Sequence, residues 1–578
     1  MAEYLAPGTY IEELRSAVVP IQGVSTSTAG FVGRTERGPD VPLLVTSWPE
    51  YTRWFGGHVN TAQSYLPFAV QGFFANGGQR LFIARVNGAG ATAATLAQPF
   101  GAGPGLVATA IGTGEWGNRI SLTLLRSRKE PARTGSTDPE PPPADRFRLR
   151  VAYLDPGNGE ITEEYDDLAV DPLAPRAAIA TVNAASHLIT LHWQDPGLSP
   201  VLPELPDDGA PPVALSAGSD GASITAADYL GDPGAALDAQ RGLAALEAID
   251  QISILAIPDA VGPLTAVELP VRTPDAAPVP EGPEVPEVPE GPEAGPVSEA
   301  ERVADSDASG TSTADQSGAV VEGLLEQCER LKDRMAILDV GKGQGDVAGI
   351  AGGYLSRRSD YAAIYYPFIR VLDPLTGEPV LVPPSGHIAG VYAFNDVTRG
   401  VHKAPANYEL RGILSRNVTP TQGPLEFTVT KGQQDILNPQ GVNVLRDFRA
   451  SGQGVRVWGA RTISADPGWI YVNVRRLFIF VEESIDEALQ WVVFEPNDEP
   501  TWARVRQSIS VFLERVWRDG GLMGTTPSQA FFVRCDRTTM STDDILNGRL
   551  ICLVGLAAVR PAEFVILRFS QITIEATT

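Results

Sequence analysis

The chain has 578 residues, of which 43% are hydrophobic, so it is too long for one core and predicts about two to four domains. Its formal net charge of −25 argues against nucleic acid as the main partner. No apolar run reaches the roughly 18 residues of a membrane span, and Met1 to Tyr4 does not open a signal peptide, so we expect cytoplasmic synthesis and no membrane insertion. Cys328, Cys535 and Cys552 lack metal-ligand spacing and predict buried free thiols.

The amino-terminal segment predicts a short strand after a turn at Pro7-Gly8. The strand residues are Thr9, Tyr10, Ile11, Glu12, Glu13 and Leu14. Few of them are apolar, so two interpretations stay open: a frayed terminus or local edge strand, or an arm that adds a strand to a neighbour's sheet.

Gly-flanked strands then alternate with a helix, which predicts an α/β fold. We expect strands at 29–33, 41–45 and 80–86 and a helix at 65–76 that ends at Asn76-Gly77-Gly78. The run Gly33 to Pro39 lacks the Gly-Lys-Ser/Thr ending of a phosphate loop and is read as a plain turn.

Residues 101–214 predict a β-rich unit with strands at 120–125, 147–154, 161–168 and 188–192. Gly112 to Gly117 matches G-x-G-x-x-G, the pattern of dinucleotide sites. The residues after it alternate with period two and predict a strand, whereas a dinucleotide site needs a helix there. The pattern therefore does not predict a nucleotide site.

The α/β pattern resumes after residue 215. A helix is expected at 242–249 and a strand at 251–258, and a helix at 321–335 precedes strands at 336–339 and 362–366. The interval 271–317 between these halves is acidic and proline-rich, and Glu284 to Glu290 repeats with period three, which favours extended polyproline II. We interpret this interval as an insertion exposed to solvent.

Two amphipathic helices are predicted in the last third of the chain, one from Val474 to Leu489 and one after Asp498-Glu-Pro500. The second should bury Trp502, Val505, Ile509, Phe512, Leu513 and Val516. Its reverse face carries Arg504, Arg515 and Arg518, which form either a solvated face or a basic stripe for an acidic partner.

Three final strands are expected at 530–535, 549–559 and 563–574. The last is apolar on both faces, so it must be covered inside this subunit or cross to another one. Its candidate contact residues are Phe564, Val565, Ile566, Leu567 and Phe569.

The run Pro383-Pro-Ser-Gly-His387, together with Gly400-Val-His-Lys-Ala-Pro-Ala-Asn407, resembles the signature of contractile tail sheath proteins of phage tails and related injection machines. Pro7 to Glu13 and the carboxy-terminal segments Asn473 to Arg476, Phe494 to Asp498 and Pro561 to Phe564 resemble the same family. The resemblance covers 1–100 and 215–578 outside the insertion, and 101–214 matches only loosely.

The resemblance implies an α/β and α+β multidomain fold. Its parts would be an amino-terminal arm (1–20), the first part of an α/β core (21–100), a β-rich inserted domain (101–214), a subtilisin-like α/β domain (215–410) with the insertion 271–317, a carboxy-terminal sheath domain (411–560) and a strand arm (561–578). It also implies a structural polymer of stacked rings around an inner tube, tied together by donated strands, that contracts and meets baseplate and terminator or cap proteins. No cofactor is implied, and the arginine face would meet the tube.

Two other classes of protein, an enzyme and a binding module, are the alternatives to a structural polymer. A serine hydrolase would use Ser385, His387 and Asp396, but residues two apart point to opposite sides of a strand and no Gly-x-Ser-x-Gly elbow occurs. The five histidines form no metal-ligand motif. A binding module on the surface of a particle is the other alternative.

Overall fold

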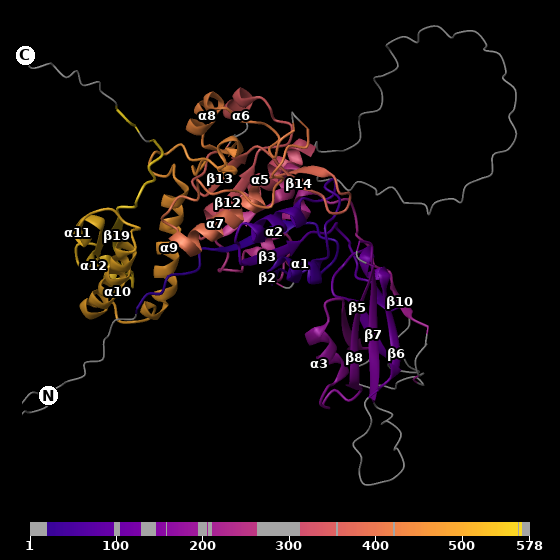
Figure 1. Ribbon diagram of the computed structural model, residues 1–578. Coiled ribbons are helices and arrows are strands. Elements are labelled where there is room, and N and C mark those ends of the chain that lie inside the picture. Colours follow the sequence, from indigo (N-terminus) through magenta and orange to yellow (C-terminus); the bar gives the residue numbers. More distant parts are fainter. Residues whose placement is uncertain are drawn as a thin grey trace, which may run out of the picture.

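The computed structural model describes residues 20–96, 105–128, 146–157, 159–194, 205, 211–237, 239–262, 313–353, 357–419, 422–564 and 566–568. These residues form three bodies in a row, with an α/β body between a β-rich body and a smaller carboxy-terminal body (Figure 1). The predicted mixed α/β, multidomain architecture is confirmed.

The central body is built on an eight-stranded sheet of order β17-β16-β13-β12-β11-β1-β3-β2. Six central strands run parallel, and the edge strands β2 and β17 are antiparallel to their neighbours. In sheet order the strands are Val455–Val457, Val442–Asp447, Ala362–Tyr366, Met335–Asp339, Ile254–Ala256, Thr28–Gly33, Arg80–Arg85 and Leu43–Val45. A small antiparallel pair, β14 (Ile369–Leu372) and β15 (Pro379–Val382), lies beside them.

Helices cover both faces of this sheet, and each face has its own hydrophobic cluster. One face carries α1 (Trp48–Phe55), α2 (Leu66–Ala75) and α7 (Ser385–Arg399). The other carries α4 (Ala226–Leu230), α5 (Thr313–Leu331), α6 (Val347–Gly353) and α8 (Lys431–Leu437). The predicted helix at 65–76 is confirmed as α2.

Helices α2 and α7 approach each other through glycines of α7. A Cβ on Gly386 would lie 2.4 Å from Cα of Ala69, and one on Gly390 would lie 2.4 Å from the carbonyl oxygen of Phe73. Only glycine allows backbones to come this close.

The β-rich body is a seven-stranded antiparallel sheet of order β8-β7-β6-β10-β4-β5-β9. The strands are Gly159–Ala169, Arg146–Asp155, Ile120–Arg126, Val213–Ser216, Thr95–Leu96, Leu106–Ala110 and Ile189–Trp193. The G-x-G-x-x-G run leads into a 3-10 turn at Glu115–Arg119 and then into β6, as expected. Helix α3 (Ala178–Ala185) was not predicted.

The carboxy-terminal body contains α9 (Val472–Ala488), α10 (Glu499–Arg518), α11 (Pro527–Ala530), β18 (Phe531–Arg534), α12 (Thr542–Leu546) and β19 (Leu553–Leu556). Both long helices match the prediction, and all six expected core residues of α10 are buried. The side chain of Asp498 caps α10 by accepting from the backbone N–H of Thr501, at 3.0 Å.

Two predicted elements need correction. The helix expected at 242–249 is only a 3-10 turn at Ala244–Leu246, in which the backbone N–H groups of Leu246 and Glu247 bond the carbonyl oxygens three residues earlier. Helix α5 begins at Thr313, eight residues before the expected start and inside the predicted insertion; most of that insertion lies outside the described residues.

Candidate assembly site

A two-stranded sheet lies on the carboxy-terminal body. Strands β18 and β19 pair antiparallel, with Phe531 opposite Leu556 and Arg534 opposite Leu553, and neither pairs with another strand among the described residues. Phe532 and Leu553 are each 50% exposed. A lone pair of strands is marginally stable in water, and unpaired backbone groups at its edges can bind another strand.

After the carboxy-terminal body the chain returns to the central body, where it is fixed at Glu563, and it is exposed beyond that residue. The Glu563 carboxylate accepts hydrogen bonds from Nε of Arg461 and Nδ2 of Asn438, both at 2.9 Å, and these lower its pKa although burial alone would raise it. Phe564, Ile566 and Leu567 are 72%, 77% and 71% exposed.

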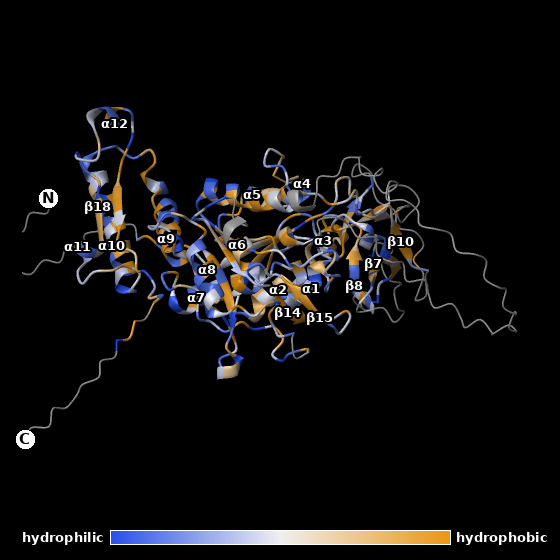
Figure 2. Cartoon of the chain, turned by 90° about the horizontal axis from the view of Figure 1, so that it is seen from above, coloured by the Kyte–Doolittle hydropathy of each residue, from blue (hydrophilic) through white to orange (hydrophobic). Residues whose placement is uncertain are grey.

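The strand expected at 563–574 is not formed in its described part, since residues 563–564 and 566–568 pair with no strand. No strand of the described part of the chain pairs with these residues, so the prediction of strand structure there is corrected for the isolated subunit. Val565 and Phe569 lie outside the described residues. Figure 2 shows apolar residues along the chain that leads from the body toward the carboxy terminus.

The amino-terminal end of the described chain lies on the carboxy-terminal body. Ile21 is buried in the same hydrophobic cluster as α9 and α10, and the backbone N–H of Val24 donates to Oγ of Ser484 at 3.1 Å. The amino-terminal end therefore leaves from this body, whereas the carboxy-terminal end leaves beside Asn438 and Arg461 of the central body (Figure 1). The predicted strand residues Thr9 to Leu14 lie outside the described residues.

The three predicted arginines of α10 do not form a uniform basic stripe. Arg504 donates to Glu495 at 3.0 Å and stacks over Trp491, and Arg518 pairs with Glu514. Arg515 is exposed and lines a cleft with Asp519. Two of the three charges are already balanced within the subunit, which the sequence pattern alone did not reveal.

The three hydrolase candidates are not brought together. Ser385 and His387 lie on helix α7, not on a strand as assumed, and both are buried. Asp396 pairs instead with Arg476, at 2.8 Å, and Nδ1 of His387 has no hydrogen-bond partner. Burial lowers the pKa of His387 to about 4, so its imidazole stays neutral in the core.

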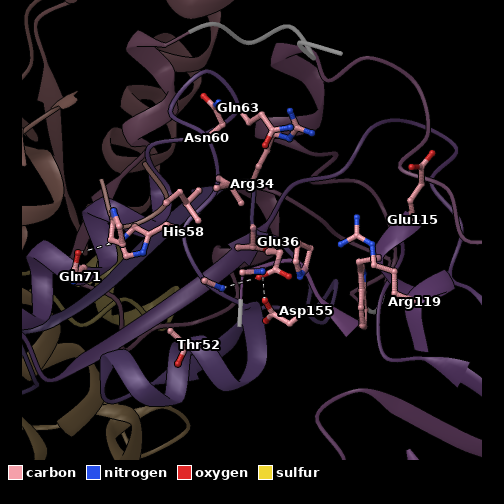
Figure 3. Close-up of a pocket in the computed structure, with 18 of the residues that line it drawn as sticks. Arg34, Glu36, Thr52, His58, Asn60, Gln63, Gln71, Glu115, Arg119 and Asp155 are labelled. Atoms are coloured by element: carbon pink, nitrogen blue, oxygen red, sulfur yellow. Dashed lines mark hydrogen bonds between the residues drawn. The ribbon is translucent and has the colours of Figure 1, made fainter. Parts of the chain in front are cut away.

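A polar cavity of about 900 Å³ lies where the central body meets the β-rich body (Figure 3). Arg34 and Glu36, which follow β1, line it together with Arg119 of the 3-10 turn and Asp155 of β7. Beside the cavity the buried Arg37 pairs with Asp155 at 3.1 Å, and the Tyr153 hydroxyl donates to Glu36 at 2.8 Å. The segment 33–39, read as a plain turn, therefore joins two bodies.

No three His, Cys, Asp or Glu side chains of the described residues are grouped to hold a metal ion. Within the same residues, no helix has the length and apolar character needed to cross a membrane.

Two consecutive family models match the chain: the phage tail sheath protein central domain at 314–463 and the phage tail sheath C-terminal domain at 464–572. Residues 314–572, which make up less than half of the chain, match the phage tail sheath family. Among curated members, a putative prophage major tail sheath protein of Pseudomonas aeruginosa is 26% identical over 44% of this chain and 61% of its own length. The tail sheath protein of Burkholderia phage BcepMu is 31% identical over 29% of this chain and 34% of its own. The matches thus span less than two thirds of these relatives.

Solved structures of the sheath family share the fold over nearly the whole chain. The sheath complex of the extracellular contractile injection system PVC, in the contracted state, aligns with a TM-score of 0.52 at 22% identity, over 99% of both chains. A chain from the baseplate of the anti-feeding prophage aligns with a TM-score of 0.51 at 24% identity, over 99% of this chain and all of that one.

Proposed function

We propose that this chain is the structural subunit of a contractile sheath, which polymerises as stacked rings around an inner tube and contracts to drive the tube through a target envelope. The proposal is supported by the match of residues 314–572 to the tail sheath family and by a fold shared with a contracted sheath complex. The observation that carries it in this chain is that the carboxy-terminal end presents three exposed apolar side chains just beyond Glu563, its last fixed residue.

The exposed ends and the β18–β19 sheet complement each other. A strand donated by a neighbouring copy would pair with an open edge of this sheet and cover Phe532 and Leu553. Each backbone hydrogen bond would contribute about 0.5–1.5 kcal/mol and each buried apolar side chain about 1.5–3 kcal/mol. Donated strands of this strength would hold copies together while weaker contacts between the bodies rearrange during contraction.

Three finer parts of the proposal rest on the family resemblance. The central body would be a subtilisin-like domain that serves as a scaffold and not as an enzyme, which agrees with the dispersed Ser385, His387 and Asp396. The inner tube would meet the α10 arginines, of which Arg515 is the most available. Baseplate and terminator or cap proteins would bind the ends of the polymer. The assembled sheath would belong to a phage tail or a phage-tail-like particle.

Electron microscopy of the purified chain tests the proposal. We expect striated tubules, whereas a population of stable monomers at all concentrations would contradict it and favour a hydrolase or a surface binding module. Removal of residues 1–15 should leave a folded, soluble protein that no longer polymerises, because residues from 20 onward already anchor the segment on α9. Tubules formed by that truncated chain would refute the amino-terminal arm.

A further inference from the structure

Two of the three cysteines face each other across the β18–β19 sheet. The strand pairing ends at Arg534 opposite Leu553. Continuing this register by one step sets Cys535 opposite Cys552, and a hydrogen-bond contact between the two thiols agrees with that placement. Directly opposite residues of an antiparallel pair have their Cα atoms about 4.5–5.5 Å apart and their side chains on the same face. This separation lies inside the range of about 4.4–6.8 Å that a disulfide spans.

The surroundings keep the two sulfur atoms together. Both cysteines belong to one hydrophobic cluster with α9 and α10. Nη1 of Arg506 donates to the carbonyl oxygen of Cys535 at 3.1 Å, and Oγ1 of Thr539 donates to the carbonyl oxygen of Ile551 at 2.8 Å, so the chain is held on both sides of the pair.

The thiols also interact directly. The neighbouring thiol of Cys552 lowers the pKa of Cys535, and the same contact raises the pKa of Cys552. Cys535 is fully buried, whereas Cys552 is half-buried. A small oxidant therefore reaches Cys552 first.

We propose that Cys535 and Cys552 are a disulfide-forming site, which is reduced in the structure and is closed by a disulfide oxidant such as oxidised glutathione. The half-buried Cys552 thiol loses its proton to solvent and attacks one sulfur of the oxidant, whose S–S bond breaks and releases one glutathione thiolate. The Cys535 thiol then attacks the Cys552 sulfur of the mixed disulfide, and its proton passes to the second glutathione as that group leaves. Two cysteine sulfurs are oxidised and one glutathione disulfide is reduced to two thiols.

The bond would join the end of β18 to the residue before β19. It would close the loop that contains α12 and fix the separation of the two strands. A pair of strands that is marginal alone would then hold its edges in place in an oxidising medium. The inference does not depend on whether a second copy donates a strand to this sheet.

Counting free thiols before and after oxidation tests the proposal. The full-length chain is incubated with oxidised glutathione, freed of the reagent, denatured and alkylated, and the labelled cysteines are counted by mass spectrometry. We expect labelling to fall from three cysteines to one, with an intact mass lower by two hydrogens and with Cys535 and Cys552 in one linked peptide. Cys328, fully buried on α5 in a separate cluster with its pKa raised to about 12 by burial, is the internal control and should stay labelled. Three labelled cysteines after oxidation, or glutathione retained on the protein, would overturn the proposal.

Single substitutions give a second readout that does not depend on disulfide stability. Cys535→Ser should trap one glutathione on Cys552, because the resolving thiol is gone, and a reductant should remove it. Cys552→Ser should leave the buried Cys535 unmodified. Equal modification of the two variants would contradict the order of attack and the assigned partners.

Discussion

Replacing the three exposed apolar residues of the carboxy-terminal arm with serine should abolish assembly without unfolding the subunit. Phe564, Ile566 and Leu567 are about three-quarters exposed, so they contribute little to the stability of a single chain. Full burial of each side chain is worth about 1.5–3 kcal/mol, so burying the remaining surface of all three against a neighbour should contribute about 4 kcal/mol. Since each 1.4 kcal/mol is about tenfold in affinity, we expect the contact to weaken roughly 1,000-fold.

Sedimentation velocity over a concentration series would measure this effect as a rise in the concentration needed for polymer formation. The midpoint of thermal unfolding of the unassembled chain should stay unchanged. A matched control replaces Leu173 and Leu237 with serine. These two residues are 92% and 76% exposed and lie far from the arm in sequence, so the control variant should assemble like the parent. If the arm variant polymerises at the parent concentration, or if the control fails equally, the reasoning about the arm is wrong.

Three further predictions concern the core and the tube contact. Gly390→Ala should lower the free energy of unfolding by about 1–3 kcal/mol in urea titrations, because its Cβ would meet the carbonyl oxygen of Phe73, while Gly432→Ala, with open space around it, should be neutral or slightly stabilising. Burial raises the pKa of Asp339 to about 7, so the parent should lose up to a few kcal/mol of stability as the pH rises from about 4 through 7. Asp339→Asn should remove this slope, and equal slopes in parent and variant would contradict the assignment. Charge reversal of the three α10 arginines should spare folding and weaken assembly on the tube, and normal tube-containing particles would refute that contact.

The sequence predicted the elements whose apolar spacing is regular. The prediction succeeded for the helices α2, α9 and α10 and for the parallel strands around β12. Burial of one face or of both faces of an element leaves a regular spacing of apolar residues in the sequence. The predicted helix at 242–249 is instead a 3-10 turn, whose backbone hydrogen bonds span three residues. The apolar spacing of so short a segment does not distinguish the two kinds of helix.

The two arms stay predictions. The anchoring of the amino-terminal end depends on Ile21 packing against helices more than 400 residues away, which no local pattern indicates. The facing of Cys535 and Cys552 follows from strand register, which sequence separation alone does not give. The prediction of a basic stripe on α10 considered only the arginines. It left out Glu495 and Glu514, whose negative charges pair with Arg504 and Arg518.

The central claim is that the ends of the chain are shared between copies. We would assemble a mixture of isotopically heavy and light chains that carry a photoreactive residue in place of Ile566, cross-link the polymer and identify the linked peptides by mass spectrometry. The account predicts that cross-links from the arm to β18 or β19 join heavy to light peptides as often as random mixing allows. Cross-links found only within heavy or only within light chains would contradict it.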